Sequence, residues 1–348
     1  MTDHFAGSVS RRSFVVGVAS TGFATAIQAG EVQDPSSDAA NVPGRNRTEP
    51  VREGQWIWRE PSTAIFSDTP TAFHCTIADP LPKTATLSWR WSIGPATAQA
   101  GETVFDVERG ATVQLAAQGL KPGLVHETQL DLEITPTVIG GTAKRTVWLC
   151  SPDVFHDRQQ WLKSLDIHLF DLAGTLATRL KTARVPFQRD LELKALDRLT
   201  TGLLIVAENN KVTDDTLAKI AWNLVQRGVS VLWIAPTALE LPDPTSDNGA
   251  TPPREFHLRR EEFVTELDKR FSAAPWSDPA TIRRWSPACG RSRVVWRESS
   301  SPVGWSWIEG IWPNRARLVV CGLPLVPLWD LDPTPRYLLL KLLERFQT

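Results

Sequence analysis

Residues 202–207 read GLLIVA, and residues 229–234 read VSVLWI. Both stretches are almost entirely aliphatic, which is typical of parallel strands that helices cover on both faces. Between them, residues 213–228 place apolar side chains at helical spacing and end at a glycine, which predicts an amphipathic helix. A strand, a helix and a second strand in this order predict an α/β unit with a parallel sheet.

The same pattern continues on both sides of that unit. A short apolar run at 166–171 and a helical stretch at 174–182 precede it, and an apolar run at 317–322 follows it. These segments predict further strands and helices of one layered domain. We expect the last helix to begin with Thr334 as its N-cap and Pro335 at its first position.

The preceding part of the chain has a different period. Between residues 56 and 148, short stretches alternate apolar and polar side chains and are separated by Pro and Gly. Residues 87–93 read LSWRWSI, so Leu, Trp, Trp and Ile share one face. Such strands predict an antiparallel β-sandwich of immunoglobulin type. We therefore expect a sandwich over residues 53–160 and a three-layer α/β domain over residues 161–348.

The N-terminus carries the pattern of an export signal. Residues 10–16 read SRRSFVV, which resembles the twin-arginine signal through Arg11, Arg12 and Phe14. The uncharged stretch that follows is too short and too weakly apolar for a stable membrane span. The resemblance implies that residues 1–29 are a signal peptide. It also implies that the twin-arginine translocase exports a folded protein to the periplasm or the cell surface.

Composition limits the kinds of partner. The chain has 348 residues, with 38 Lys and Arg against 39 Asp and Glu, a formal net charge of -1. This balance argues against nucleic acid, which usually requires a basic field. Residues 30–52 are polar and almost free of large apolar side chains, so we expect a disordered linker there.

Two resemblances bear on the fold. Residues 166–348 resemble the class I glutamine amidotransferase-like fold, which is also found in trehalose-utilisation-type proteins. With LSW at 87–89, AGE at 100–102 and VERGA at 107–111, residues 71–150 are similar to the immunoglobulin-like accessory domains of family-2-type glycoside hydrolases. Together they imply a sandwich followed by a flavodoxin-like, three-layer α/β domain, without the catalytic barrel of such hydrolases. The first resemblance rests on LFD at 169–171, VPF at 185–187, the strand at 203–207 and ARLVVCGLPL at 316–325.

The amidotransferase chemistry itself is not supported. An active member has a Cys nucleophile at a turn after a strand, and the corresponding turn at 207–210 reads AENN. Without the nucleophile, glutamine hydrolysis by this route is excluded. We therefore expect a non-catalytic protein without a cofactor that binds a carbohydrate or a protein partner.

Glu208 and Asn209 are the candidate ligand contacts, because open α/β sheets bind ligands beyond the carboxyl ends of their strands. One alternative is a glycan-acting hydrolase in which carboxylates such as Glu208 serve as acid or base. A second is that Glu208 is only a solvated residue that helps to cap the next helix. A third alternative is that the whole chain is a structural subunit of a separately encoded enzyme.

Tryptophan and cysteine add further candidates. Seven tryptophans lie between residues 276 and 329. Trp305, Trp307 and Trp312 could stack on a sugar ring, and packing in the core is the alternative. Cys75 and Cys150 flank a Trp in the order of immunoglobulin domains, a resemblance that implies a disulfide in an exported protein. Buried thiols are the alternative. No His or Cys pair has the spacing of a metal site.

Overall fold

The structure is a computed structural model of the chain. It describes residues 51–53, 56–59, 62–77, 84–106, 110–115, 127–137, 141–208, 214–237, 240–242, 251–276, 278–289, 294–299 and 303–347. The signal residues Arg11, Arg12 and Phe14, the candidate Asn209, and the expected linker as far as residue 50 lie outside these ranges.

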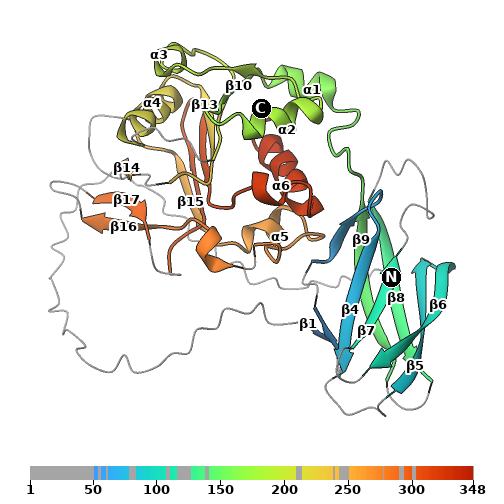
Figure 1. Cartoon of the computed structure of the whole chain (residues 1–348). Helices are drawn as coiled ribbons and strands as arrows, with labels where there is room; N and C mark the ends of the chain where they lie inside the picture. The colour runs from blue at the N-terminus through green and yellow to red at the C-terminus, as the bar shows by residue number, and fades with distance from the viewer. Residues whose placement is uncertain are drawn as a thin grey trace, which may run out of the picture.

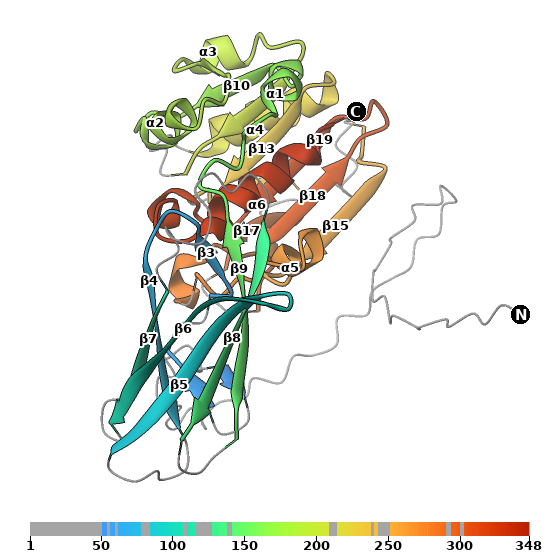
Figure 2. The ribbon, with the colours of Figure 1, turned by 90° about the vertical axis from the view of Figure 1, so that its right-hand side faces the viewer.

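The first part of the chain folds into two β-sheets (Figures 1 and 2). One sheet has the strand order β1-β2-β4-β7 and the other β3-β9-β8-β5-β6. All pairs are antiparallel except β3 with β9, which is parallel. The strands are β1 (Val51–Glu53), β2 (Trp56–Trp58), β3 (Ala64–Phe66), β4 (Thr71–Ile77), β5 (Thr84–Ile93), β6 (Ala96–Asp106), β7 (Ala111–Leu115), β8 (Thr128–Pro136) and β9 (Ala143–Cys150).

Alternation along the strands builds the core between these sheets. On β8, the buried Leu130, Leu132 and Ile134 alternate with more exposed residues. Trp91 on β5 is fully buried, and its ring centroid lies 5.3 Å from that of Phe73 on β4. The predicted period of two is therefore confirmed for this part of the chain. β1 begins at residue 51, so the last two residues of the expected linker belong to a strand.

The second part contains a seven-stranded sheet of order β11-β10-β12-β13-β19-β18-β15. The first five strands in this order run parallel, and β18 and β15 run antiparallel to their neighbours. The bounds are β10 (Ile167–Phe170), β11 (Gln188–Arg189), β12 (Leu203–Val206), β13 (Ser230–Ile234), β15 (Glu255–Arg259), β18 (Trp307–Ile311) and β19 (Arg317–Cys321).

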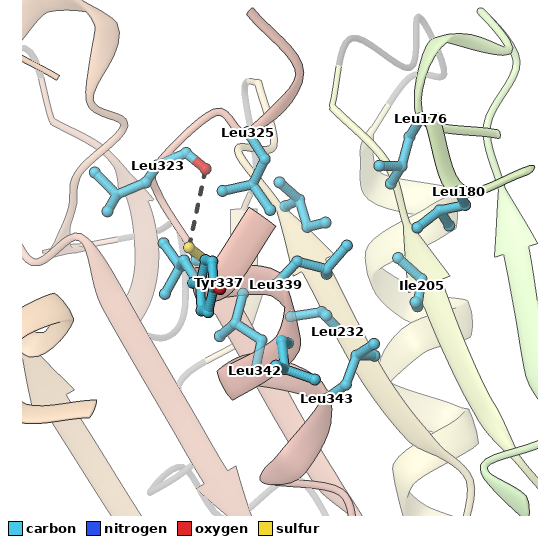
Figure 3. Close-up of a cluster of buried hydrophobic side chains, with 14 of the residues drawn as sticks. Leu176, Leu180, Ile205, Leu232, Leu323, Leu325, Tyr337, Leu339, Leu342 and Leu343 are labelled. Carbon is cyan, nitrogen blue, oxygen red and sulfur yellow. Dashed lines mark hydrogen bonds between the residues drawn. The ribbon is translucent and has the colours of Figure 1, made fainter. Parts of the chain in front are cut away.

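Helices cover both faces of this sheet, as Figure 1 shows. Alternate residues of β12 point to opposite faces: Leu203 and Ile205 join one hydrophobic cluster, and Leu204 and Val206 join the other. Leucines of α6 pack on the first face together with those of α2 (Figure 3). The first face carries α1 (Gln159–Ser164), α2 (Thr175–Thr182), α5 (Phe263–Leu267) and α6 (Pro333–Glu344), and the second carries α3 (Leu193–Leu196) and α4 (Asp214–Gln226).

The second face also holds a small antiparallel sheet that the sequence patterns did not predict. Its order is β14-β17-β16, with bounds β14 (Glu240–Pro242), β16 (Trp285–Cys289) and β17 (Val294–Glu298). Trp285 and Trp296 bring it into the cluster formed by α4. A part made of β-sheets and a mixed α/β part thus follow one another, which confirms the predicted class at this level.

Arg270, in the second part, pairs with Glu127 of the first part. Its Nη1 is 2.6 Å from Glu127 Oε2, and its Nη2 is 2.6 Å from Asp268 Oδ2. Burial alone would raise the pKa of Glu127, but hydrogen bonds from its own backbone N–H, Arg270 and Tyr337 hold that pKa below its usual value. An ionised carboxylate therefore bridges the first part of the chain to the second.

A second arginine reinforces this contact. Arg336 of α6 donates from Nη1 to the carbonyl oxygen of Pro152 at 2.6 Å, and its guanidinium lies 4.5 Å from the ring centroid of Phe66. Ala64 and Cys150 from the sandwich also pack in the hydrophobic cluster around α6. The two parts are therefore joined by apolar packing as well as by charge.

The expected N-cap of the last helix is wrong. Asp332, not Thr334, caps α6: its Oδ1 accepts a hydrogen bond from the backbone N–H of Thr334 at 2.7 Å. Pro333 occupies the first helical position, where its missing N–H costs nothing. A carboxylate at this place also faces the positive end of the helix dipole.

The expected disulfide is absent as well. Cys75 on β4 packs inside the sandwich, and its Sγ donates to the carbonyl oxygen of Ala111 at 3.8 Å. Cys150 on β9 packs in the cluster around α6 instead. Both are thiols, and because their side chains belong to different clusters they do not meet. Burial raises the pKa of the Cys150 thiol far above its ordinary value. Among the described helices, none is long and apolar enough to cross a membrane.

Candidate functional site

Two carboxylates follow neighbouring strands at the carboxyl edge of the parallel sheet. β10 ends at Phe170 and β12 at Val206, and these two residues pair in register. Asp171 comes directly after the first strand and Glu208 two residues after the second. Asp171 is 0 % exposed and Glu208 is 2 % exposed. Carboxylates are rarely buried to this extent unless they have partners.

Asp171 uses both of its oxygens to anchor the start of α2. Its Oδ1 accepts a hydrogen bond from the N–H of Gly174 at 2.8 Å, and its Oδ2 accepts one from Ala177 at 2.8 Å. The N-cap of α2 is Gly174, at a φ of 75° that glycine adopts readily. Arg189, which ends β11, donates to the carbonyl oxygen of Asp171 at 2.6 Å. The Asp171 side chain therefore has a structural task.

Glu208 ties the end of β12 to the connection between β19 and α6. Its Oε1 accepts a hydrogen bond from the N–H of Val326 at 2.7 Å. Burial raises the pKa of Glu208 to about 7; hydrogen bonds from the backbone of Val326 and Leu325 oppose this, and the charge of Asp171 adds to it. The interpretation of Glu208 as a solvated helix-capping residue is wrong, because the side chain is buried and holds a different segment.

The acid–base chemistry open to this edge is limited. A carboxyl group with a pKa near 7 can give or take a proton at neutral pH, which general acid–base catalysis requires. However, Glu208 is enclosed, and the Asp171 carboxylate beside it is bonded to helix backbone. Cys321, on β19, is no nucleophile either, because burial raises the pKa of its thiol to about 12.

A histidine–carboxylate contact beside the first half of β10 escaped sequence reasoning. His168 on β10 places Nδ1 2.7 Å from Oδ2 of Asp190, the residue that follows β11. Its Nε2 lies 3.8 Å from Oδ1 of Asp166, which precedes β10. Both His168 and Asp190 are largely buried. This contact fixes the two-residue edge strand β11, and its only sequence signal is a His within a short apolar run.

Exposed leucines lie on three loops of the carboxyl edge. Leu172 follows β10 and is 43 % exposed, Leu191 follows β11 and is 49 % exposed, and Leu331 lies between β19 and α6 and is 77 % exposed. They are three of the five large hydrophobic side chains that are exposed among the described residues. Sequence reasoning missed them, because single leucines in loops follow no period.

Ion pairs and hydrogen bonds hold these loops in place. Arg179 of α2 places Nη1 2.5 Å from Oδ2 of Asp330, the residue before Leu331. Arg336 reaches the other oxygen of Asp330 at 2.9 Å. The 3₁₀ helix η3 (Val326–Leu328) contacts α2 as well. The exposed Leu331 is therefore presented from an anchored segment.

The tryptophan candidates do not form one exposed surface. Trp307 is completely buried, and its ring centroid is 4.6 Å from that of Phe263 in the cluster around α6. Trp312 is buried on the opposite face of the sheet, against Trp222. The packing alternative is therefore correct for both. Trp305 is half-buried, and the guanidinium of Arg260 lies 5.5 Å from its ring centroid.

Neither a metal site among the described residues nor a similarity to known proteins adds a further candidate site. Within the ranges that the structure describes, no three His, Cys, Asp or Glu side chains are grouped so that they could hold a metal ion. No protein-family model matches the chain, and no curated protein matches it.

Proposed function

We propose that this chain is an exported, non-catalytic protein that binds a protein partner through the carboxyl edge of its α/β part. The observation that carries the proposal is the placement of exposed Leu172, Leu191 and Leu331 on three loops of that edge. Exposed apolar side chains at one edge of the sheet support a protein interaction site, because large exposed apolar surface is typical of such sites. The buried carboxylates behind them serve the scaffold that presents these loops.

A protein partner explains this surface better than a carbohydrate. Sugar rings stack on exposed aromatic faces, but Trp307 and Trp312 are buried. The face of Trp305 is shared with Arg260. Aliphatic side chains anchored by neighbouring ion pairs suit a protein interface with an apolar centre and a charged rim. A separately encoded enzyme is one partner that fits, with the present chain as its structural subunit.

The finer fold assignments support the same proposal. The parallel strands follow the order β11-β10-β12-β13-β19, which is the second, first, third, fourth and fifth along the chain. This order is that of flavodoxin-like domains, and it agrees with the resemblance to the amidotransferase-like fold. The strand order of the sandwich, with β9-β8-β5 in one sheet and β4-β7 in the other, supports an immunoglobulin-like domain. Both are accessory-type domains.

The test places charges on exposed apolar side chains of two different surfaces. The double variant Leu172→Asp, Leu331→Asp puts two charges on the carboxyl edge, and Val104→Asp puts one on β6, where Val104 is 66 % exposed. After cross-linking in the native host, we expect a partner that is captured by the wild type and by Val104→Asp but lost from the double variant. Equal capture by all three proteins would contradict the proposal.

One observation favours a second candidate, a glycan-acting hydrolase. The pKa of Glu208, raised to about 7 by burial, is the kind of value that a general acid has. Opening of the connection after β19 would then be required before a substrate could reach the carboxyl group. A glycan-hydrolysis screen with wild type and Glu208→Gln tests it, and turnover that disappears in the variant would replace the binding proposal.

A further inference from the structure

A concave region lies at the opposite, amino edge of the parallel sheet. It is a cleft of about 370 Å³ between the starts of β12, β13 and β19, the helix α1 and the end of the chain at Phe346 and Gln347. Its volume is within the range of small-molecule sites. It is separate from Asp171 and Glu208, which lie beyond the other ends of the same strands.

Two glycines line the cleft. Gly202 and Gly228, just before β12 and β13, both have a positive φ, 89° and 98°. A Cβ at Gly202 would meet the carbonyl oxygen of Asp166 at 2.4 Å, so only glycine fits there. Apolar side chains, among them Leu165, Leu203 and Phe346, line the same cleft. A ligand with an apolar body therefore finds both space and contact.

Trp161 brings an aromatic side chain to the cleft. Trp161 of α1 lines it, and the indole Nε1 is buried without a hydrogen-bond partner among the described residues. Five other buried indole N–H groups among the described residues also have no partner, so Trp161 contributes its ring to the cleft and not a specific donor.

Arg315 brings a positive charge to the same place. It is exposed, and no described carboxylate pairs with it. Its φ of 70° is in the left-handed region, which is unfavourable for a residue other than Gly or Asn. The turn is fixed by hydrogen bonds, including Arg315 N–H to the carbonyl oxygen of Trp312 at 2.9 Å. A strained, charged residue at a cleft is a recognised sign of function.

We infer that the cleft between Trp161 and Arg315 binds a small organic anion, a carboxylate or phosphate group on an apolar body. The guanidinium pairs with the oxyanion, and the apolar body lies against Phe346 and Leu203. The residues that line the cleft include no acidic side chain, but Asp166 Oδ2 lies 3.1 Å from the position that a Cβ of Gly202 would occupy. This site is independent of the proposed partner surface at the carboxyl edge.

The test uses benzoate and phenyl phosphate as probes and benzamide as the neutral match, with the full chain. Binding is followed by calorimetry and by the indole ¹H–¹⁵N resonance of Trp161, which is assigned through its loss in Trp161→Phe. We expect one of the two anions to bind and to move that resonance, and benzamide not to. The anion that binds more tightly identifies the group that the cleft recognises.

Variants then assign the binding to the cleft. Arg315→Gln should weaken binding of the anion about tenfold, because a hydrogen bond to a charged group is lost. Arg184→Gln is the matched control, since Arg184 is also exposed and has a positive φ, 56°, but lies outside the cleft. Binding of neither anion, equal binding of benzamide, or equal losses in the two variants would overturn the inference.

Discussion

The carboxylate of Glu208 accepts a hydrogen bond at 2.7 Å from the backbone N–H of Val326, a residue 118 positions further along the chain. This bond joins the carboxyl end of β12 to the connection that leads into α6. Because α6 in turn packs on the sheet and meets the sandwich, a single side chain at the sheet edge helps to position the interface between the two parts of the molecule.

Removing the Glu208 acceptor should destabilise the fold. Glu208→Ala leaves the N–H of Val326 buried without a partner, which costs about 1–3 kcal/mol. Glu208→Gln keeps an acceptor oxygen and should cost much less. Urea unfolding of both variants checks this, and equal losses would show that the N–H of Val326 is satisfied in another way.

Stability should depend on pH through the same residue. The pKa of Glu208 is raised from 4.5 to about 7 in the folded state, mainly by burial, so the folded state binds this proton more tightly than the unfolded one. Its contribution is fully present below pH 4.5 and is lost as the pH rises through 7. Because one pKa unit corresponds to about 1.4 kcal/mol, the loss is roughly 3 kcal/mol.

The difference between wild type and Glu208→Gln isolates this effect. Other carboxylates, such as Glu127 and Asp268, have lowered pKa values and act in the opposite direction, but they are common to both proteins. From pH 4.5 to 7, the unfolding free energy of the wild type should therefore fall relative to that of Glu208→Gln. Below and above this range, the difference between the two proteins should stay constant. Parallel curves over the whole range would refute the assignment.

Arg270 should contribute more to stability than a surface arginine. Arg270→Ala leaves the carboxylates of Glu127 and Asp268 without their common partner, and we expect a loss of about 2–3 kcal/mol. Arg90→Ala is the control, because Arg90 pairs with Glu133 on the exposed side of the sandwich, where such pairs contribute about 1 kcal/mol or less. Similar unfolding midpoints for the two variants would contradict a role for Arg270 in joining the parts.

Glu309 offers a sharper case of a buried charge. It is completely buried on β18 and accepts hydrogen bonds from Arg317 at 3.0 Å and from Arg345 at 2.9 Å. Glu309→Gln leaves two guanidinium groups without a counter-charge and should cost about 3 kcal/mol. Glu344→Gln, in a partly exposed ion pair with Lys341, should cost about 1 kcal/mol or less. Thermal unfolding distinguishes the two.

Substitutions of Trp307 and Trp305 should differ in their effect on stability. Trp307→Ala removes a completely buried ring and should cost about 3–5 kcal/mol. Trp305→Ala should cost much less, because that ring is half-buried. If the wild type bound a glycan on an array and a folded Trp305→Ala variant did not, this result would support carbohydrate binding by the chain. Absence of glycan binding in the wild type is the outcome that we expect.

Sequence periodicity predicted the strands and helices that bury a continuous face. The strand at Thr71–Ile77 and the segments that became β10, β12, β13 and β19 were all visible as alternating or aliphatic runs. In contrast, β11 has two residues, both exposed, and is fixed by the contact of His168 with Asp190. Such a strand has no period of its own, because a side chain from a neighbouring strand holds it.

The candidate site was predictable only in part. The place of Glu208 at a strand end follows from the chain order, but its burial depends on Val326, which no local pattern connects to it. The same limit applies to Trp305, Trp307 and Trp312, whose clustering in sequence says nothing about which face of the sheet each one reaches. Pairings between distant segments decide both questions.

The separate locations of Cys75 and Cys150 bear on where the protein can mature. These two side chains and Cys321 are buried thiols, so the described parts of the fold are complete without an oxidant. A chain that folds before export must do so in the cytosol, where thiols stay reduced. The packing of these buried thiols is compatible with the export of a folded chain that we propose, because it requires no oxidation.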